Sequence, residues 1–242
     1  MTIQEMHYDF DLKIDKVASQ TKENFNKAEK DWLLNEGILV LLKTKYGINN
    51  PKRRGFENSQ KRIDDLSSLH IKYPDQPGIT PTTLESGVLE VPLSSLKYDY
   101  LFLTRGYTDV IYSNCSKKVS LRYIDTDDLN EVLFLDPFNS SNNEQIVINF
   151  GKSSEEEGSS IYLYPGTLTL GKVYLEYLKY PAKVNLGNYT YIDGIEYPQQ
   201  NCDLPTQVHP EVVDMAVAIA SGIIEHPTYT QLKQNKLFVL SE

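Results

Sequence analysis

The sequence predicts an α+β fold, with helices at both ends of the chain and a central, mostly antiparallel β domain. Apolar residues recur at helical spacing in residues 1–72 and again in residues 201–242, whereas residues 73–200 alternate in the manner of strands. Residues 88–197 hold 13 of the 17 tyrosines, which suit half-buried sheet faces and protein interfaces. We therefore expect the N-terminal helices and the C-terminal helix to pack together beside a separate β-rich domain.

Two capping boxes mark the starts of the first two helices. Thr2 with Glu5, and Asn26 with Glu29, place a side-chain acceptor at the helix start and a carboxylate three residues later. The first helix, ending near Ser19, carries the apolar stripe Ile3, Met6, Phe10, Ile14 and Val17. The second carries Trp32, Leu39, Leu42 and Tyr46. A third, shorter helix over residues 59–69 should turn inward Ile63, Leu66 and Leu69.

The central region reads as strands separated by turn sequences. Three prolines and two glycines make residues 73–87 a long connector, which we expect to be an exposed loop. Asp193 and Gly194 should turn a hairpin over residues 189–197. Polar loops at residues 139–143 and 153–159 are expected to be mobile. The predicted strands cover residues 88–91, 100–112, 117–124, 146–150, 160–164 and 167–180.

The C-terminal helix, predicted from Pro210 to about Glu225, differs from the first because it is apolar on nearly every side. A helix with this pattern is buried on more than one face. Pro210 suits the first helical position, and Glu211 suits the positive end of the helix dipole. Its apolar residues are Val212, Val213, Met215, Ala216, Val217, Ile219, Ala220, Ile223 and Ile224.

Charge and cysteine content exclude several functions. A net charge of -9 and a pI of about 5.0 argue against binding that depends on neutralising phosphates or anionic lipid. The one dense basic run, Lys52, Arg53 and Arg54, is typical of a solvated loop. Cys115 and Cys202 form no CxxC motif and suit a reducing compartment. We expect neither a signal peptide nor a transmembrane helix.

No set of residues has the spacing of a catalytic, cofactor or metal site. Gly151 and Lys152 resemble the end of a phosphate-binding loop, but Ile146 stands where its first glycine is required. His209, Glu211 and Asp214 could supply metal ligands, yet we favour capping and dipole interactions there. The remaining acidic residues are interpreted as a solvated helix face (Asp9, Asp11, Asp15) and as hydrogen-bonding groups at element ends (Asp64, Asp65, Asp127, Asp128).

Several longer motifs resemble the portal-vertex ring proteins of crAss-like bacteriophages, over nearly the whole chain. In the N-terminal region these are residues 31–36 (DWLLNE) and 55–66 (GFENSQKRIDDL). In the C-terminal region they are residues 202–205 (CDLP), 209–217 (HPEVVDMAV) and 231–236 (QLKQNK). The order of helices, sheet and helix is also similar to that of the head-to-tail adaptors of short-tailed phages.

This resemblance implies a virion structural protein without enzyme activity, assembled in the host cytoplasm and placed at the portal vertex or tail. Such adaptors form a ring of twelve copies below the portal and continue the DNA channel towards the tail. Their partners are copies of the same chain, the portal protein and neighbouring ring or tail proteins, and genomic DNA passes without sequence-specific binding. Two alternatives remain open: a carbohydrate-binding tail accessory, which would use the tyrosines, and a small hydrolase.

Overall fold

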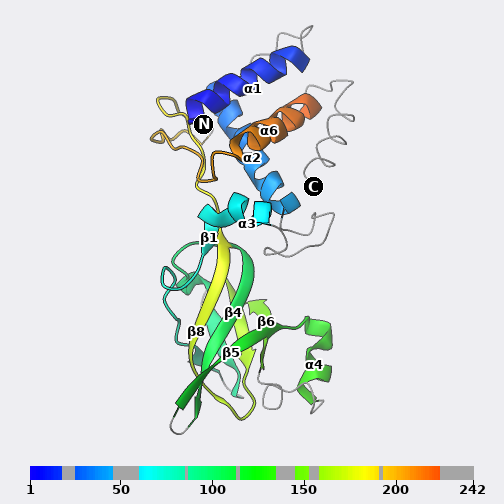
Figure 1. Cartoon of the computed structure of the whole chain (residues 1–242), viewed down its shortest axis with the longest axis vertical. Helices are drawn as coiled ribbons and strands as arrows, with labels where there is room; N and C mark the ends of the chain where they lie inside the picture. The colour runs from blue at the N-terminus through cyan, green and yellow to red at the C-terminus, as the bar shows by residue number, and fades with distance from the viewer. Residues whose placement is uncertain are drawn as a thin grey trace. The chain divides into compact units, whose positions relative to one another are not determined.

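The chain divides into a helical unit and a β unit. The computed structural model describes residues 1–17, 25–45, 60–84, 87–112, 115–134, 145–152, 158–190 and 193–223. Met1–Leu69 and Pro181–Glu242 form the helical unit, and His70–Tyr180 forms the β unit. The β unit is therefore an insertion within the sequence of the helical unit. The combination of helices with a mostly antiparallel sheet confirms the predicted α+β class (Figure 1).

The helical unit contains four α-helices within the described residues, and both predicted capping boxes are formed. Thr2 N–H donates to Glu5 Oε2 at 2.9 Å, and Glu5 N–H donates back to Thr2 Oγ1 at 3.3 Å. Asn26 and Glu29 make the same reciprocal pair at 2.7 and 2.9 Å. The elements are α1 (Ile3–Val17), α2 (Lys27–Lys45), α3 (Gln60–Leu66), the short 3-10 helix η2 (Ser67–Leu69) and α6 (His209–Ile223).

The C-terminal helix α6 packs against both α1 and α2, as predicted (Figure 1). The approach to α2 is close because Gly37 has no side chain. A Cβ atom at Gly37 would lie 3.0 Å from the Val212 carbonyl oxygen and 3.1 Å from the Ala216 nitrogen. The predicted burial on several sides is also confirmed by the completely or almost completely enclosed residues Val212, Val213, Ala216, Val217 and Ala220.

The buried face of α2 differs from the expected stripe. Trp32 is 41% exposed, and Leu33, its neighbour in sequence, is enclosed instead. The charged Asp31 is also completely buried, so the inward face of α2 is partly polar. Because Asp31 occupies a core position, the buried positions of α2 do not form a continuous apolar pattern, and the prediction depended on such a pattern. The apolar side chains that do face the core from α2 are Leu33, Leu34, Ile38, Leu41 and Leu42.

Within its described residues, the β unit is built on one eight-stranded sheet, in the order β1-β8-β4-β5-β6-β7-β3-β2. All strand pairs in it are antiparallel except β5 with β6. The six predicted strands all occur, with ends shifted by at most a few residues. The strands are β1 (His70–Ile71), β2 (Thr82–Thr83), β3 (Leu89–Pro92), β4 (Tyr100–Tyr112), β5 (Cys115–Tyr123), β6 (Gln145–Lys152), β7 (Ser159–Tyr164) and β8 (Thr169–Lys179).

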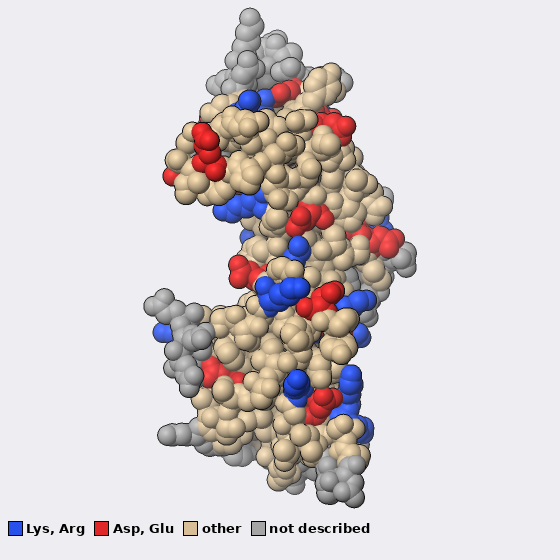
Figure 2. Space-filling model, turned by 90° about the vertical axis from the view of Figure 1, so that its left-hand side faces the viewer, with Lys and Arg blue, Asp and Glu red and all other residues tan. Residues whose placement is uncertain are grey.

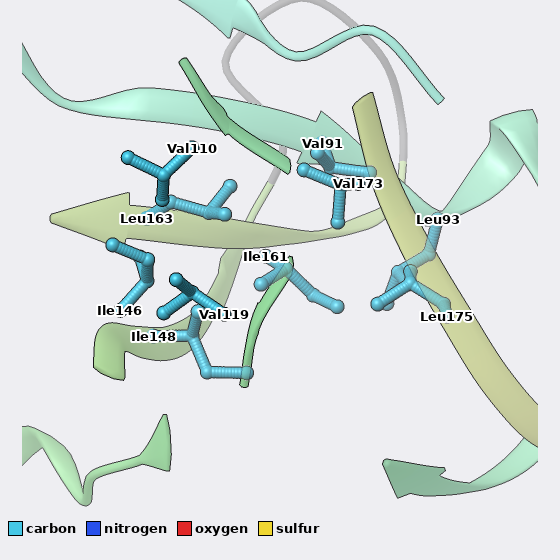
Figure 3. Close-up of a cluster of buried hydrophobic side chains, with 10 residues drawn as sticks. All are labelled: Val91, Leu93, Val110, Val119, Ile146, Ile148, Ile161, Leu163, Val173 and Leu175. Atoms are coloured by element: carbon cyan, nitrogen blue, oxygen red, sulfur yellow. The ribbon is translucent and has the colours of Figure 1, made fainter. Parts of the chain in front are cut away.

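The sheet is curled around its own core. Val91 of β3 and Val173 of β8 come from strands near opposite edges of the sheet, yet both belong to one buried cluster (Figure 3). A flat sheet of this width could not bring those strands to one core. The 3-10 helix η4 (Leu93–Ser95) adds one residue to the cluster, whose members are Val91, Leu93, Val110, Val119, Ile146, Ile148, Ile161, Leu163, Val173 and Leu175.

Most described residues of the connector over residues 73–87 are exposed, as expected, but parts of the connector pair with strands of the sheet. Ile79 pairs with Val173 of β8, and β2 pairs with β3, so the connector lies against both edges of the sheet. The side chain of Gln76 is buried, and its Oε1 accepts from Lys97 N–H at 2.9 Å and from the Tyr177 hydroxyl at 3.2 Å. A covered strand edge cannot pair with the strand of another chain, so the position of this proline-rich segment protects the sheet from aggregation.

A short helix that the sequence analysis missed, α4 (Thr126–Phe134), joins the parallel strands β5 and β6. Neighbouring parallel strands require a crossover, and α4 lies within it. Asn149 of β6 donates to Thr126 Oγ1 at 3.3 Å and so fixes the start of the helix. The two polar loops predicted at residues 139–143 and 153–159 lie largely outside the described residues.

We predict that Ala220→Glu destabilises the helical unit by several kcal/mol. Ala220 is completely enclosed in α6, and a carboxylate placed there would lose its hydration, which is very costly. Ile223→Glu is the matched control, because Ile223 lies on the same helix and is 57% exposed. Thermal unfolding followed by circular dichroism should show a large decrease in melting temperature for the first variant only. Equal melting temperatures for the two variants would contradict the burial of α6.

Candidate assembly surfaces

A buried carboxylate on α2 binds the returning chain, which is the segment after Pro181 where the chain re-enters the helical unit from the β unit. Asp31 is completely enclosed, and its Oδ1 accepts from Nε2 of His7 at 2.7 Å. Its Oδ2 accepts from Leu186 N–H at 2.9 Å and from the hydroxyl of Tyr189. A buried carboxylate requires such donors, because removing it from water without them is very costly. Asp31 thereby connects α1, α2 and residues 186–189 through a single side chain.

Asn35, one turn further along α2, binds the same returning segment. Its Oδ1 accepts from Val184 N–H at 2.8 Å, and its Nδ2 donates to the Val184 carbonyl at 3.0 Å. The same amide group also donates to the Asp31 carbonyl at 2.8 Å. Asn35 thus gives the backbone of Val184 both hydrogen bonds that a neighbouring strand would otherwise provide. The segment that it positions leads directly into an exposed arm.

The exposed arm, residues 185–200, is a short hairpin of the helical unit. Asn185 bridges to Gln200 at its base and Thr190 to Glu196 nearer its tip, where Asp193 and Gly194 form the predicted turn. The tip residue Ile195 is 54% exposed. Hydrogen bonds from the Tyr197 hydroxyl (2.6 Å) and the Ile195 N–H (3.0 Å) lower the pKa of Asp193.

A pocket of about 320 Å³ lies between the arm and the chain before it. Its lining includes the opposite charges of Lys183 and Asp193, the amide of Asn35, and the rings of Tyr197 and Pro198. Within this lining, the Tyr197 hydroxyl donates to the Asp193 carboxylate, an exposed pair that spans the turn of the arm.

The candidate metal ligands on α6 form ion pairs with other helices instead. Glu211 Oε2 lies 2.7 Å from Nζ of Lys45, and Asp214 Oδ1 lies 3.0 Å from Nζ of Lys13. His209 turns inward and donates from Nε2 to the Leu204 carbonyl at 2.7 Å. Among the residues that the structure describes, no cluster of His, Cys, Asp and Glu could hold a metal ion. Glu211 and Asp214 therefore join α6 to α2 and α1, and His209 joins the start of α6 to the segment before it.

The acidic pair Asp64 and Asp65 separates in the structure. Asp65 is buried and forms an ion pair with Lys45, while Nε2 of Gln207 donates to its other oxygen at 3.1 Å. Asp64 is exposed and lies near the end of α3. The buried ion pair of Asp65 was missed, because adjacent helical residues point apart and only one of them reaches the core.

The other acidic candidates lie on helix surfaces. Asp9 and Asp11 on α1 form partly exposed ion pairs with Lys13 and Lys30, each at 2.7 Å, in agreement with a solvated face. Asp127 and Asp128 lie in the first turn of α4, where carboxylates favour the positive end of the helix. The side chain of Asp15 lies outside the described part of the chain.

The glycine and lysine that resemble a phosphate-binding loop belong to a continuous strand. Gly151 and Lys152 are the last residues of β6 and pair with Ser160 and Ser159 of β7. The ring of Tyr162 covers Gly151, where an added Cβ would lie only 2.3 Å from the ring. The glycine therefore makes room for a tyrosine rather than for a phosphate. The basic run Lys52, Arg53 and Arg54 lies outside the described residues.

Tyrosine and lysine side chains form a preorganised surface on the β unit. Tyr107 and Tyr174 stack with ring centroids 4.9 Å apart, and Tyr73 meets Tyr174 edge-on at 5.7 Å. Nζ of Lys118 lies 4.9 Å above the Tyr107 ring and 5.3 Å above the Tyr174 ring. Desolvation, followed by the hydrogen bond with Asp109, raises the pKa of Tyr174. We call Tyr73, Tyr107, Lys118 and Tyr174 the tyrosine–lysine face.

Charge is distributed rather than gathered on one side of the molecule. In Figure 2, acidic and basic side chains are interspersed and separated by uncharged surface. A nucleic-acid-binding protein would instead show Lys and Arg gathered into a patch or stripe. The distribution on this side of the molecule agrees with the net charge of -9 in arguing against binding through phosphates.

We predict that Asp31→Ala destabilises the helical unit by about 3 kcal/mol or more, because it removes the completely buried carboxylate that accepts from His7, Leu186 and Tyr189. Asp11→Ala is the matched control: its ion pair with Lys30 is half-exposed and should contribute less than about 1 kcal/mol. Urea unfolding should separate the two variants clearly. Similar midpoints would show that Asp31 does not hold the returning chain.

The two cysteines, which are both free thiols, should differ in reactivity. Burial raises the pKa of Cys202 to about 11, so only about one molecule in a thousand carries the reactive thiolate at pH 8. Cys115 is exposed. Maleimide labelling of the native protein at pH 8, followed by peptide mass spectrometry, should therefore modify Cys115 first. In urea the two rates should converge, and equal rates without urea would contradict the burial of Cys202.

Comparison with known proteins identifies the family. The described helices include none that is long and apolar enough to cross a membrane. No curated protein matches the chain. A family model described as phage tail ring protein 3/4, of the crAss group, matches residues 1–233. This match covers both units and nearly the whole sequence, so the chain belongs to the crAss phage tail ring protein 3/4 family.

Proposed function

We propose that this chain is a structural subunit of the virion that closes into a ring at the head-to-tail connection, below the portal. The observation that carries the proposal is the family match over residues 1–233. The candidate metal ligands Glu211 and Asp214 form ion pairs between helices, and Gly151 of the phosphate-loop-like motif packs against a tyrosine ring. These contacts agree with a structural role. Family membership favours this function over a carbohydrate-binding tail accessory or a hydrolase.

A ring places a specific requirement on the subunit. Each copy must bind its two neighbours through two different surfaces, because a head-to-tail contact closes only when one surface fits another on the next copy. The chain offers suitable material in its described part: an exposed arm with Ile195 at its tip, and the tyrosine–lysine face. Tyrosine is enriched at the centres of protein interfaces. Two distinct exposed surfaces support assembly into a ring.

The lumen of such a ring continues the DNA channel from the portal to the tail. A subunit with a net charge of -9 attracts DNA little, and like charge keeps the duplex from adhering to the wall. The proposal therefore includes passage of genomic DNA without sequence-specific binding. The neighbours along the channel are the portal protein and other ring or tail proteins. We take a copy number of about twelve from the resemblance to portal-vertex rings and from cyclic closure.

The proposal predicts that the purified chain, alone or with adjacent virion proteins, forms closed rings of about a dozen copies. Native mass spectrometry gives the copy number, and cryo-electron microscopy of virions gives the place of the ring along the portal–tail axis. Ring-shaped density for this chain between portal and tail would support the connector function. A chain that stays monomeric under all these conditions and is absent from virions would contradict it.

A further inference from the structure

An aromatic patch with two cations lies beside the start of β4 and the end of β8. Nζ of Lys97 and Nζ of Lys179 lie 5.1 and 5.4 Å from the centroid of the Tyr98 ring. Tyr98 is 41% exposed, and Tyr180 is 50% exposed. The Tyr180 N–H donates to the Asp99 carbonyl at 2.9 Å, so the two segments lie side by side. We call Lys97, Tyr98, Lys179 and Tyr180 the Tyr98 patch.

Two buried polar side chains hold the backbone of the Tyr98 patch in place. Gln76 and Tyr177 are enclosed, and the Tyr177 hydroxyl donates to Gln76 Oε1 at 3.2 Å. Gln76 Oε1 also accepts from the Lys97 N–H at 2.9 Å. The Tyr177 hydroxyl accepts from the Tyr98 N–H at 3.3 Å. The backbone that carries the exposed ring is therefore fixed before any partner binds, and a surface ordered in this way loses little conformational entropy on binding.

The two segments of the Tyr98 patch carry a positive charge, unlike the tyrosine–lysine face. On that face the carboxylate of Asp109, across from Lys118 and hydrogen-bonded to Tyr174, balances the one lysine. In residues 96–100 and 178–180, by contrast, one carboxylate stands against two ammonium groups. Aromatic rings beside such cations fit a partner that offers a carboxylate next to an apolar side chain.

The arm (yellow to orange in Figure 1) offers these groups at its tip. It contains two carboxylates, Asp193 and Glu196, and no lysine or arginine. Ile195 is 54% exposed, and Tyr197 is 40% exposed. Asp193 already accepts from the Ile195 N–H and from the Tyr197 hydroxyl, and Lys183 lines the same pocket. The exposed Glu196 is therefore the carboxylate that we assign to a partner.

We propose that the arm tip of one copy binds the Tyr98 patch of the next copy. The inference rests on the proposed ring function and assigns a contact between neighbouring subunits. Opposite charges favour Glu196 against Lys97 and Lys179 of the neighbour. The exposed side chain of Ile195 then packs against the Tyr98 ring, which suits the apolar centre of an interface. Because the arm and the patch are different surfaces of one chain, the contact is head-to-tail, and its repetition closes a ring.

An exchange of charges tests this contact in the full-length protein, under conditions in which the unmodified chain forms rings. Glu196→Lys alone and Lys97→Glu alone should each lower the fraction of subunits in rings by about tenfold or more, because like charges then meet at every interface. An equimolar mixture of the two variants should form rings again, with the variants alternating, since each arm then meets a patch of opposite charge. Native mass spectrometry of the separate and mixed proteins gives the composition of every ring.

Lys118→Glu is the matched control, because Nζ of Lys118 makes a similar contact with a tyrosine ring, 4.9 Å from the centroid of Tyr107, outside the Tyr98 patch. It should assemble normally, and all variants should keep the circular dichroism spectrum of the unmodified chain.

Three results would decide against the inference or its basis. Normal ring formation by Glu196→Lys or by Lys97→Glu would overturn the contact, including rings that then fail to join virions because the patch binds another protein. A mixture of the two variants that stays unassembled would also overturn it. This holds even where the double variant assembles, because the arm would then meet the patch of its own chain. An unmodified chain that forms no ring would instead contradict the proposed function.

Discussion

The helical unit depends on hydrogen bonds between one turn of α2 and a segment that lies 149 to 158 residues later in the sequence. Asp31 and Asn35 bind the backbone of Val184 and Leu186, and Asp31 also binds His7 of α1. These contacts specify where the returning chain lies, which apolar packing alone does not do, because hydrophobic contacts are not directional. The position of the arm and the entry into α6 both follow from them.

Much of the fold could be predicted from local patterns, and the failures have identifiable physical causes. The capping boxes and the six strands depend on neighbouring residues, so the sequence displays them directly. The buried Asp31 and the pair of Lys45 with Asp65 were missed, because a buried charge is stable only beside a partner that is distant in sequence. Helix α4 did have a recognisable pattern, since Leu129, Val132 and Leu133 follow two acidic residues at helical spacing. Its nine residues are too few for that pattern to be distinguished from a loop.

The candidate surface was less predictable than the fold. The richness in tyrosine indicated an interface, but alternation could not tell which rings face outward. Strand β4 shifts register against β8 at three places, including between Thr108 and Val110, and each shift can change which face a residue joins. Tyr177 shares the buried side of β8 with Val173 and Leu175, whereas Tyr174 points to the other side and stacks on Tyr107 there. Such irregularities depend on the partner strand and leave no mark in the sequence itself.

The insertion of the β unit has a consequence for how such proteins diversify. The unit begins at His70 and ends at Tyr180, and His70 pairs directly with Leu178, so the two ends of the insert lie side by side. Domains with adjacent termini tolerate transfer into a loop of another domain. Recombination between related genomes can thus exchange the β unit as a cassette, changing the contacts of a subunit while Asp31 and Asn35 continue to assemble the helices that flank it.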